Sequence, residues 1–212
     1  MSQRKRSINS RSERGSAKGE RIGIFGGTFD PVHLGHLIAA QEAAESMHLD
    51  RVLFVPSGRP PHKRGRSLSP AADRLGMVRM AIRGDARFAC SDAELRTQCA
   101  SYTVATLERL KKEHRGSRLF LLIGLDQAAL LSTWRKPERL FALAKVCVLS
   151  RPGFEFGQIE KKWRDKIVPV AISGIDISAS AIRERIKQGK SIRYLVPTAV
   201  ESYITRKRLY RQ

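Results

Sequence analysis

Short apolar runs alternate with helical patterns along most of this chain, and this alternation constrains its fold more than any other feature. We expect strands at 21–26, 51–57, 118–124, 144–153 and 166–172, and helices at 36–48, 71–84, 102–116, 178–189 and 197–210. Strands that alternate with helices in this way form a parallel sheet, and right-handed crossovers place the helices on both faces. The pattern predicts a single α/β domain with a Rossmann-like, doubly wound sheet.

The expected domain runs from residue 21 to residue 205, between two basic ends. Residues 1–20 are rich in Ser, Arg and Gly and hold few large apolar side chains, so we expect a flexible tail. Residues 206–212 form a shorter basic end. Inside the domain, residues 58–70 read as a basic loop rich in Pro and Gly.

The chain is strongly basic, with 40 Lys and Arg against 20 Asp and Glu and a net charge of +20. The expected domain is itself basic, which favours polyanionic partners. A nucleic-acid-binding protein and an enzyme of phosphorylated small molecules both fit this charge. Because we recognise no nucleic-acid recognition element and aromatic residues make up only 7%, no specific nucleic acid is expected.

The three cysteines, Cys90, Cys99 and Cys147, form no C-x-x-C pair. An odd number without such a pair favours reduced thiols over a disulfide framework or a zinc site. The basic start of the chain is not followed by the apolar segment of a signal peptide, and no apolar run is long enough to span a bilayer. We therefore expect a cytoplasmic protein that does not bind membranes.

The stretch GIFGGTFDPVHLGHLIAA, residues 23–40, joins the first expected strand to the first expected helix. Gly26 and Gly27 allow the backbone to approach a ligand closely, and Thr28 adds a hydroxyl. The N-terminus of the following helix points its N–H groups and positive dipole end at the same place. Ligands of doubly wound sheets bind at this edge, so we expect a phosphate here.

His33 and His36 lie three residues apart at the start of that helix, in the pattern H-x-G-H. Side chains at this spacing share one face, so both imidazoles can donate to one anion, and a protonated ring would add charge. A solvent-facing pair, a helix cap or a zinc site are the alternatives, but no third zinc ligand is evident nearby. The glycine spacing does not fit G-x-G-x-x-G, and GKS at 189–191 follows a helix and lacks the upstream glycine of a P-loop.

Two segments together resemble the signatures of a known superfamily. GGTFDPVHLGH, from residue 26, is similar to the first signature of the H-x-G-H nucleotidyltransferases, and residues 177–183 fit their second, I-S-x-S/T-x-x-R. Further similar stretches, at 56–63, 101–107, 121–134, 150–153 and 195–204, narrow the resemblance to the bacterial nicotinate-nucleotide adenylyltransferases. The similarity covers residues 21–205. One departure is Ala179-Ser180, where that family often has Ser-Thr.

The resemblance implies a reaction and its partners. Nicotinate mononucleotide and ATP would give nicotinate adenine dinucleotide and pyrophosphate, a step of NAD biosynthesis, without a covalent enzyme intermediate. Mg²⁺ would arrive with ATP and not in a protein metal site. The alternative acceptors are nicotinamide mononucleotide or another phosphate such as phosphopantetheine. The Ser-Tyr-Thr and Trp stretches oppose phosphopantetheine. Whether the chain forms an oligomer stays open.

The resemblance also implies roles for individual residues. His33, His36 and Arg183 would be catalytic. ATP and its phosphates would contact Gly26, Gly27, Thr28, Lys63, Asp126, Ile177 and Ser178, and the mononucleotide would contact Thr103, Trp134 and Arg135. Without the resemblance, Arg183 and Lys63 could equally be surface cations, Asp126 a helix cap and Trp134 a core residue.

Overall fold

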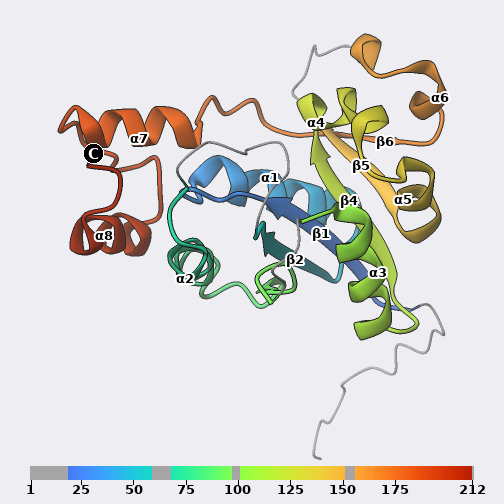
Figure 1. Ribbon diagram of the computed structural model, residues 1–212, viewed down its shortest axis with the longest axis horizontal. Helices are drawn as coiled ribbons and strands as arrows, with labels where there is room; N and C mark the ends of the chain where they lie inside the picture. The colour runs from blue at the N-terminus through green and yellow to red at the C-terminus, as the bar shows by residue number, and fades with distance from the viewer. Residues whose placement is uncertain (1–18, 59–67, 97–100, 151–155, 212) are drawn as a thin grey trace, which may run out of the picture.

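The structure is a computed structural model that describes residues 19–58, 68–96, 101–150 and 156–211 (Figure 1). Nearly all of the expected tail 1–20, most of the basic loop 58–70 and Cys99 lie outside these ranges. Within them, the chain forms a six-stranded sheet in the order β3-β2-β1-β4-β5-β6, and every neighbouring pair is parallel. The predicted doubly wound parallel sheet is confirmed.

The strands and helices follow the predicted alternation, with additions. The strands are β1 (Arg21–Gly27), β2 (Arg51–Pro56), β3 (Phe88–Cys90), β4 (Arg118–Gly124), β5 (Lys145–Ser150) and β6 (Val168–Ala171). The helices are α1 (Leu34–Ser46), α2 (Ala71–Ala81), α3 (Thr103–Glu113), α4 (Leu125–Ala129), α5 (Pro137–Leu143), α6 (Lys161–Arg164), α7 (Ala179–Lys187) and α8 (Thr198–Lys207). The sequence did not predict β3, α4, α5 or α6, because each is too short to show a period.

Both faces of the sheet are buried, which explains why its strands are continuous apolar runs. In β4, Leu119, Leu121 and Ile123 pack into one hydrophobic cluster, and Phe120 and Leu122 pack into the other. The first cluster contains the buried apolar residues of α3, α4, α5 and α6, and the second contains those of α1, α2, α7 and α8. Side chains that alternate between two covered faces are typical of parallel sheets.

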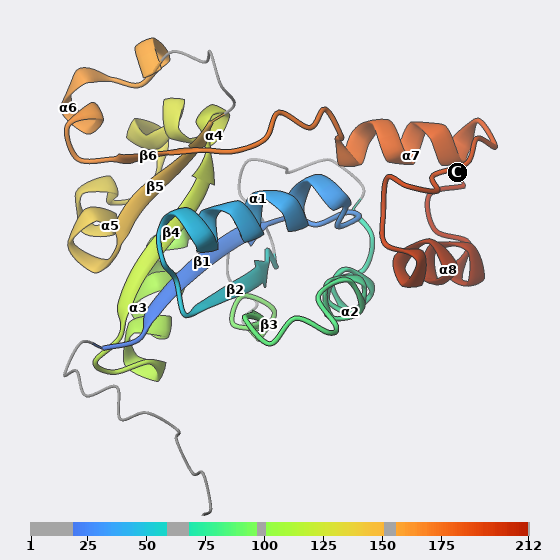
Figure 2. The same cartoon turned by 180° about the vertical axis from the view of Figure 1, so that it is seen from behind.

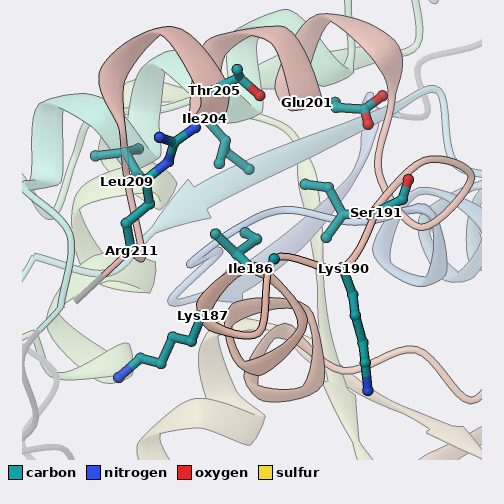
Figure 3. Close-up of a pocket in the computed structure, with 11 residues that line it drawn as sticks. Ile186, Lys187, Lys190, Ser191, Glu201, Ile204, Thr205, Leu209 and Arg211 are labelled. Carbon is teal, nitrogen blue, oxygen red and sulfur yellow. The ribbon is translucent and has the colours of Figure 1, made fainter.

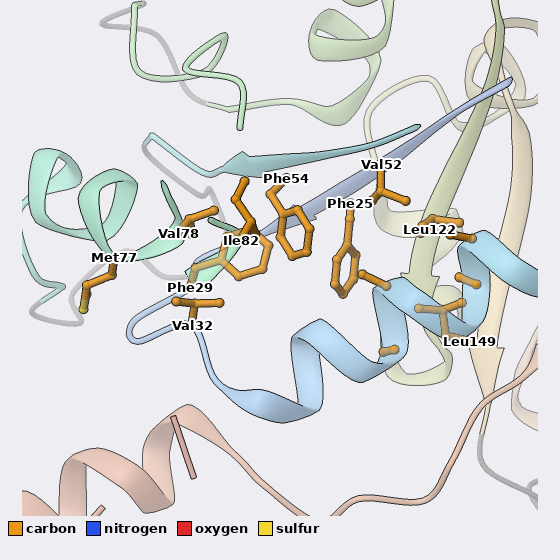
Figure 4. Close-up of a cluster of buried hydrophobic side chains, with 14 of the residues drawn as sticks. Phe25, Phe29, Val32, Val52, Phe54, Met77, Val78, Ile82, Leu122 and Leu149 are labelled. Atoms are coloured by element: carbon orange, nitrogen blue, oxygen red, sulfur yellow. The ribbon is translucent and has the colours of Figure 1, made fainter. Parts of the chain in front are cut away.

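Aromatic side chains fill the core beneath the loop that joins β1 to α1 (Figure 4). The rings of Phe25, Phe29 and Phe54 lie with centroids 5.5–5.8 Å apart. Phe29 comes from the loop itself and is only 2% exposed. Burial of three large rings stabilises the sheet and fixes the loop at the same time.

Helices α7 and α8 lie together at one end of the molecule, joined to β6 by an extended segment (Figures 1 and 2). The expected domain boundary at residue 205 falls inside α8. Ile182 of α7 and Val200 and Ile204 of α8 are buried in the same cluster as α1. In the ranges that the structure describes, no helix is both long and apolar enough to cross a membrane.

Candidate active site

The strand order reverses between β1 and β4, and a pocket of about 740 Å³ opens there. Its walls come from the carboxyl ends of β1, β2 and β4, from the start of α3 and from residues 133–135. Such a switch point is where doubly wound sheets bind their ligands. Six predicted site residues line this pocket: Gly26, Gly27, Thr28, Thr103, Trp134 and Arg135.

His33 and His36 form a close pair of tilted rings at the start of α1. His33 is the residue before the helix, and the ring centroids are 3.6 Å apart with an interplanar angle of 31°. The His33 backbone N–H donates to His36 Nδ1 at 3.2 Å. In the neutral form of His36 this bond places the ring proton on Nε2.

His33 is buried, with 6% of its surface exposed. This burial lowers the pKa of its imidazole to about 4, so the ring is neutral at pH 7. The expectation that a protonated ring adds charge therefore does not hold for His33. Its Nδ1 is buried and has no hydrogen-bond partner among the described residues, a state that proteins rarely leave uncompensated outside functional sites.

Glycines make room for this arrangement at two positions. A Cβ on Gly27 would lie 2.9 Å from the Phe29 ring, and one on Gly35 would lie 3.2 Å from His33 Nδ1. At Gly26 a Cβ would meet nothing within 4 Å, so this backbone faces open space. Gly26 and Gly27 are the last two residues of β1, which places them at the carboxyl edge of the sheet, where a ligand is expected.

The second signature segment lies directly against the first. Arg183 Nη1, on α7, donates to the backbone carbonyl of Asp30 at 2.7 Å. Ile177 lies beside Gly35, since its Cβ is 3.8 Å from where a Cβ on that glycine would stand. Ser178 caps α7 by accepting from the Ala181 N–H at 3.1 Å. The structure thus brings together segments that are about 150 residues apart in the chain.

Arg74 is a buried cation below the β1–α1 loop that sequence reasoning missed. It is 1% exposed and donates to the carbonyls of Thr28 at 2.8 Å and Ser69 at 3.1 Å. Burial lowers its pKa, and the charge of Asp30 opposes that shift. The sequence could have indicated its burial, because Arg74 shares one face of the expected helix with Met77 and Val78, three and four residues further on.

Trp134 and Ser57 present polar atoms to the pocket. The Trp134 Nε1 and Ser57 Oγ are buried, and neither has a hydrogen-bond partner among the described residues. A buried donor without a partner is costly unless a ligand satisfies it. Thr103 is the first residue of α3, and the Arg135 guanidinium lies 4.7 Å from the ring centroid of Tyr102. Sequence reasoning singled out neither Ser57 nor Tyr102.

Of the two remaining predicted phosphate ligands, one lies away from the pocket and the other cannot be placed. Asp126 is exposed in the first turn of α4, next to Gln127, and does not line the pocket. Lys63 lies outside the described residues. Over the described ranges, no three His, Cys, Asp or Glu side chains gather closely enough to hold a metal ion.

Comparison with known proteins adds a family to this geometry. Residues 24–185 match the family model described as cytidylyltransferase-like. A protein of Thermomicrobium roseum named "Probable nicotinate-nucleotide adenylyltransferase" is 45% identical over 197 residues, which is 90% of this chain and 92% of that protein. One with the same name from Rubrobacter xylanophilus is 43% identical with the same coverage.

Solved structures show the same fold at low sequence identity. Nicotinic acid mononucleotide adenylyltransferase of Plasmodium falciparum, complexed with NaAD, superposes with a TM-score of 0.74 at 19% identity, over 90% of this chain and 97% of that one. A structure from Vibrio parahaemolyticus, described as a putative nicotinate-nucleotide adenylyltransferase, gives a TM-score of 0.63 at 22% identity, over 91% and 96%.

Proposed function

The chain belongs to the cytidylyltransferase-like family and, within it, to the nicotinate-nucleotide adenylyltransferases, and on this premise we propose how its site works. The reaction joins nicotinate mononucleotide to ATP and gives nicotinate adenine dinucleotide and pyrophosphate. A phosphate oxygen of the mononucleotide attacks the α-phosphorus of ATP in line. The bond from that phosphorus to the bridging oxygen breaks, and pyrophosphate leaves.

The protein contributes positioning and charge stabilisation to such a transfer. We assign the ATP phosphates to the space above Gly26, Gly27 and Thr28, between the starts of α1 and α7. There His36 donates from Nε2 to an oxygen that gains charge in the transition state. His33, neutral at pH 7, acts as a hydrogen-bonding partner and not as a cation.

Positive charge at the phosphates comes from Arg183 and from the helix starts. Arg183 uses one nitrogen on the Asp30 carbonyl, and no other hydrogen bond of its guanidinium to a described residue is seen. The remaining N–H groups can therefore bind phosphate oxygens. The free N–H groups of the first turn of α7, together with Ile177 and Ser178, add further donors. Mg²⁺ accompanies ATP on this proposal, bound by phosphate oxygens and water.

The mononucleotide occupies the pocket between β1 and β4. Trp134 stacks on the pyridine ring, and its Nε1–H, which has no partner among the described residues, can donate to an oxygen of the mononucleotide. The backbone N–H groups at Thr103, at the start of α3, and Arg135 receive the carboxylate. Lys63 and Asp126 stay proposed phosphate ligands, carried by the family pattern alone.

One observation carries the proposal: the two signature segments touch at the loop that follows β1, where Arg183 donates to the carbonyl of Asp30, three residues before His33. A polyphosphate that occupies this junction is within reach of both. Among the described residues no comparable geometry supports nucleic-acid binding, which is argued from the basic charge. A steep salt dependence of DNA affinity in a filter-binding assay would favour that rival.

Pyrophosphate release tests the function directly. Purified protein with ATP and Mg²⁺ should release pyrophosphate when nicotinate mononucleotide is added, and mass spectrometry should detect nicotinate adenine dinucleotide. Nicotinamide mononucleotide, measured in parallel, should give a lower kcat/KM because it lacks the carboxylate. Faster turnover of the amide would assign the chain to the alternative acceptor, and absence of pyrophosphate with both would overturn the proposal.

A further inference from the structure

The segment that follows α8 reaches back to the loop between β1 and α1 through Tyr210. After α8 the backbone takes positive φ at Arg208 and again at Tyr210, with values of 52° and 65°. These turns place Leu209 and Arg211 on a hollow of about 400 Å³ between α7 and α8 (Figure 3). Tyr210 is directed elsewhere, and its hydroxyl donates to Asp30 Oδ1 at 2.6 Å.

Asp30 connects three elements to the β1–α1 loop and is only 2% exposed. Its Oδ1 accepts from Tyr210, its Oδ2 accepts from the Ser69 N–H at 3.3 Å, and its backbone oxygen accepts from Arg183. Asp30 stands three residues before His33 along the chain. A displacement of Asp30 would therefore move the anchor of the Arg183 guanidinium and the approach to the histidine pair together.

We propose that Tyr210 is a positioning residue for the transfer reaction, because its hydrogen bond to Asp30 holds the β1–α1 loop against α7. Tyr210 itself contacts no reacting atom in this account. Without its hydroxyl, Asp30 keeps a buried carboxylate oxygen with one donor fewer, which favours rotation of the side chain or entry of water. Either change shifts Arg183 and His33 relative to the bound phosphates, and small misplacements reduce turnover strongly.

The chain supplies a matched control in Tyr203. Tyr203 lies in α8, and its hydroxyl donates to Asp73 Oδ1 at 2.7 Å. Like Tyr210 it binds an aspartate, but this carboxylate belongs to α2. Within the described ranges, the Tyr203 hydroxyl makes no hydrogen bond to the β1–α1 loop. If tyrosine–aspartate bonds of this C-terminal region served stability alone, loss of either hydroxyl would have the same kinetic effect.

Steady-state kinetics separate the two tyrosines. In the full chain, Tyr210→Phe should lower kcat by about tenfold or more, with KM for ATP and for the mononucleotide within about threefold of the wild type. Tyr203→Phe should leave kcat within about twofold. The proposal is overturned if Tyr210→Phe keeps the wild-type kcat, or if both variants lose kcat equally.

Because the role of Tyr210 rests on the proposed adenylyl transfer, a readout without turnover is needed as well. The imidazole ¹H–¹⁵N signals of His33 and His36 should shift in Tyr210→Phe and stay in place in Tyr203→Phe. A wild-type chain that releases no pyrophosphate would count against the proposed function, while this spectrum still tests the loop contact. Unchanged imidazole signals in Tyr210→Phe would overturn the positioning role.

Asp30→Asn provides a second route if Tyr210→Phe does not fold. An amide has one oxygen, so it cannot accept from Tyr210 and Ser69 on separate atoms as the carboxylate does. Asp30→Asn should lower kcat with the same small change in KM. Both changes break the same contact, between Tyr210 and Asp30, so the folded double variant should lose no more kcat than the more affected single variant. If the two losses of kcat multiply, or if Asp30→Asn keeps the wild-type kcat, the proposal is contradicted.

Discussion

Burial of His33 links the stability of this chain to pH. The pKa of this imidazole falls from its ordinary value of 6.5 to about 4 on folding, because burial disfavours the charged ring. Between these two pH values the unfolded chain binds the additional proton. The free energy of unfolding therefore decreases as the pH falls from 6.5 to 4, and this group has no effect at higher pH.

The expected loss is about 3 kcal/mol across that window, from about 1.4 kcal/mol for each pH unit. Urea unfolding at pH 7.5 and at pH 4.5 measures it, with His33→Gln as a reference that cannot titrate. The wild type should lose about 2.5 kcal/mol more than the variant at the lower pH. Equal losses would mean that His33 is protonated in the folded protein.

Gly35 separates the histidine pair from the second signature segment, and its replacement should affect activity more than stability. A Cβ at this position would lie 3.2 Å from His33 Nδ1, and the adjacent His36 ring restricts the movement of His33. Gly35→Ala should lower kcat by about tenfold, while helix propensity raises or preserves the stability of α1. Gly157→Ala, where a Cβ would meet nothing within 4 Å, should leave kcat unchanged. Wild-type kcat in Gly35→Ala would contradict this view of the site.

Trp134 is the residue that most directly tests the mononucleotide pocket. Trp134→Phe keeps an aromatic ring but removes the Nε1–H donor that has no partner among the described residues. We expect KM for nicotinate mononucleotide to rise by about tenfold, and KM for ATP to change by less than about twofold. An equal rise in both KM values would indicate a general effect on the fold.

At the scale of elements, apolar and periodic patterns predicted the strands and helices that are buried along their length. They missed the short elements that form only through pairing with a neighbour. The strand expected at 118–124 is β4 without any difference in its bounds, because both of its faces are buried and every residue but the ends is apolar. Strand β3 has three half-buried residues and forms only because it pairs with β2. No local pattern can predict a strand that depends on its neighbour.

Arg74 shows the same limit within a helix. Its position on the buried face of α2 conflicts with the apolar pattern, and only the structure reveals the carbonyls that receive its N–H groups. Arg74→Met should lower the free energy of unfolding by about 3 kcal/mol, since buried carbonyls would lose their donors. Arg79→Met, an exposed change on the same helix, should cost less than about 0.5 kcal/mol. Chemical denaturation of both variants measures the difference, and equal stabilities would contradict the assigned role of Arg74.

At the scale of the whole molecule, the sequence predicted the doubly wound sheet and the edge at which a pocket opens, but not the detailed geometry of the site. The first signature was readable because glycines and histidines cluster within one short stretch. Arg183 could be assigned only by resemblance, since its contact with Asp30 joins residues 153 positions apart. Tyr210 lies beyond the expected domain boundary, and nothing in its neighbourhood signals the loop that it contacts.

The net charge of +20 acts at this scale too. Such a charge attracts polyphosphates from a distance but does not distinguish one from another. On the proposed function, the junction between the two signature segments selects ATP. The central claim is therefore that one nucleotide binds His36 of the first segment and Arg183 of the second at the same time.

Calorimetric affinity for a non-hydrolysable ATP analogue tests this claim most directly. In variants shown to be folded by circular dichroism, His36→Ala and Arg183→Ala should each weaken binding by about tenfold or more. Arg185→Ala, on the same helix as Arg183 but bonded to the Ser191 carbonyl, should bind within about twofold of the wild type. Wild-type affinity in Arg183→Ala would show that the two segments do not hold one nucleotide, and the account would fail.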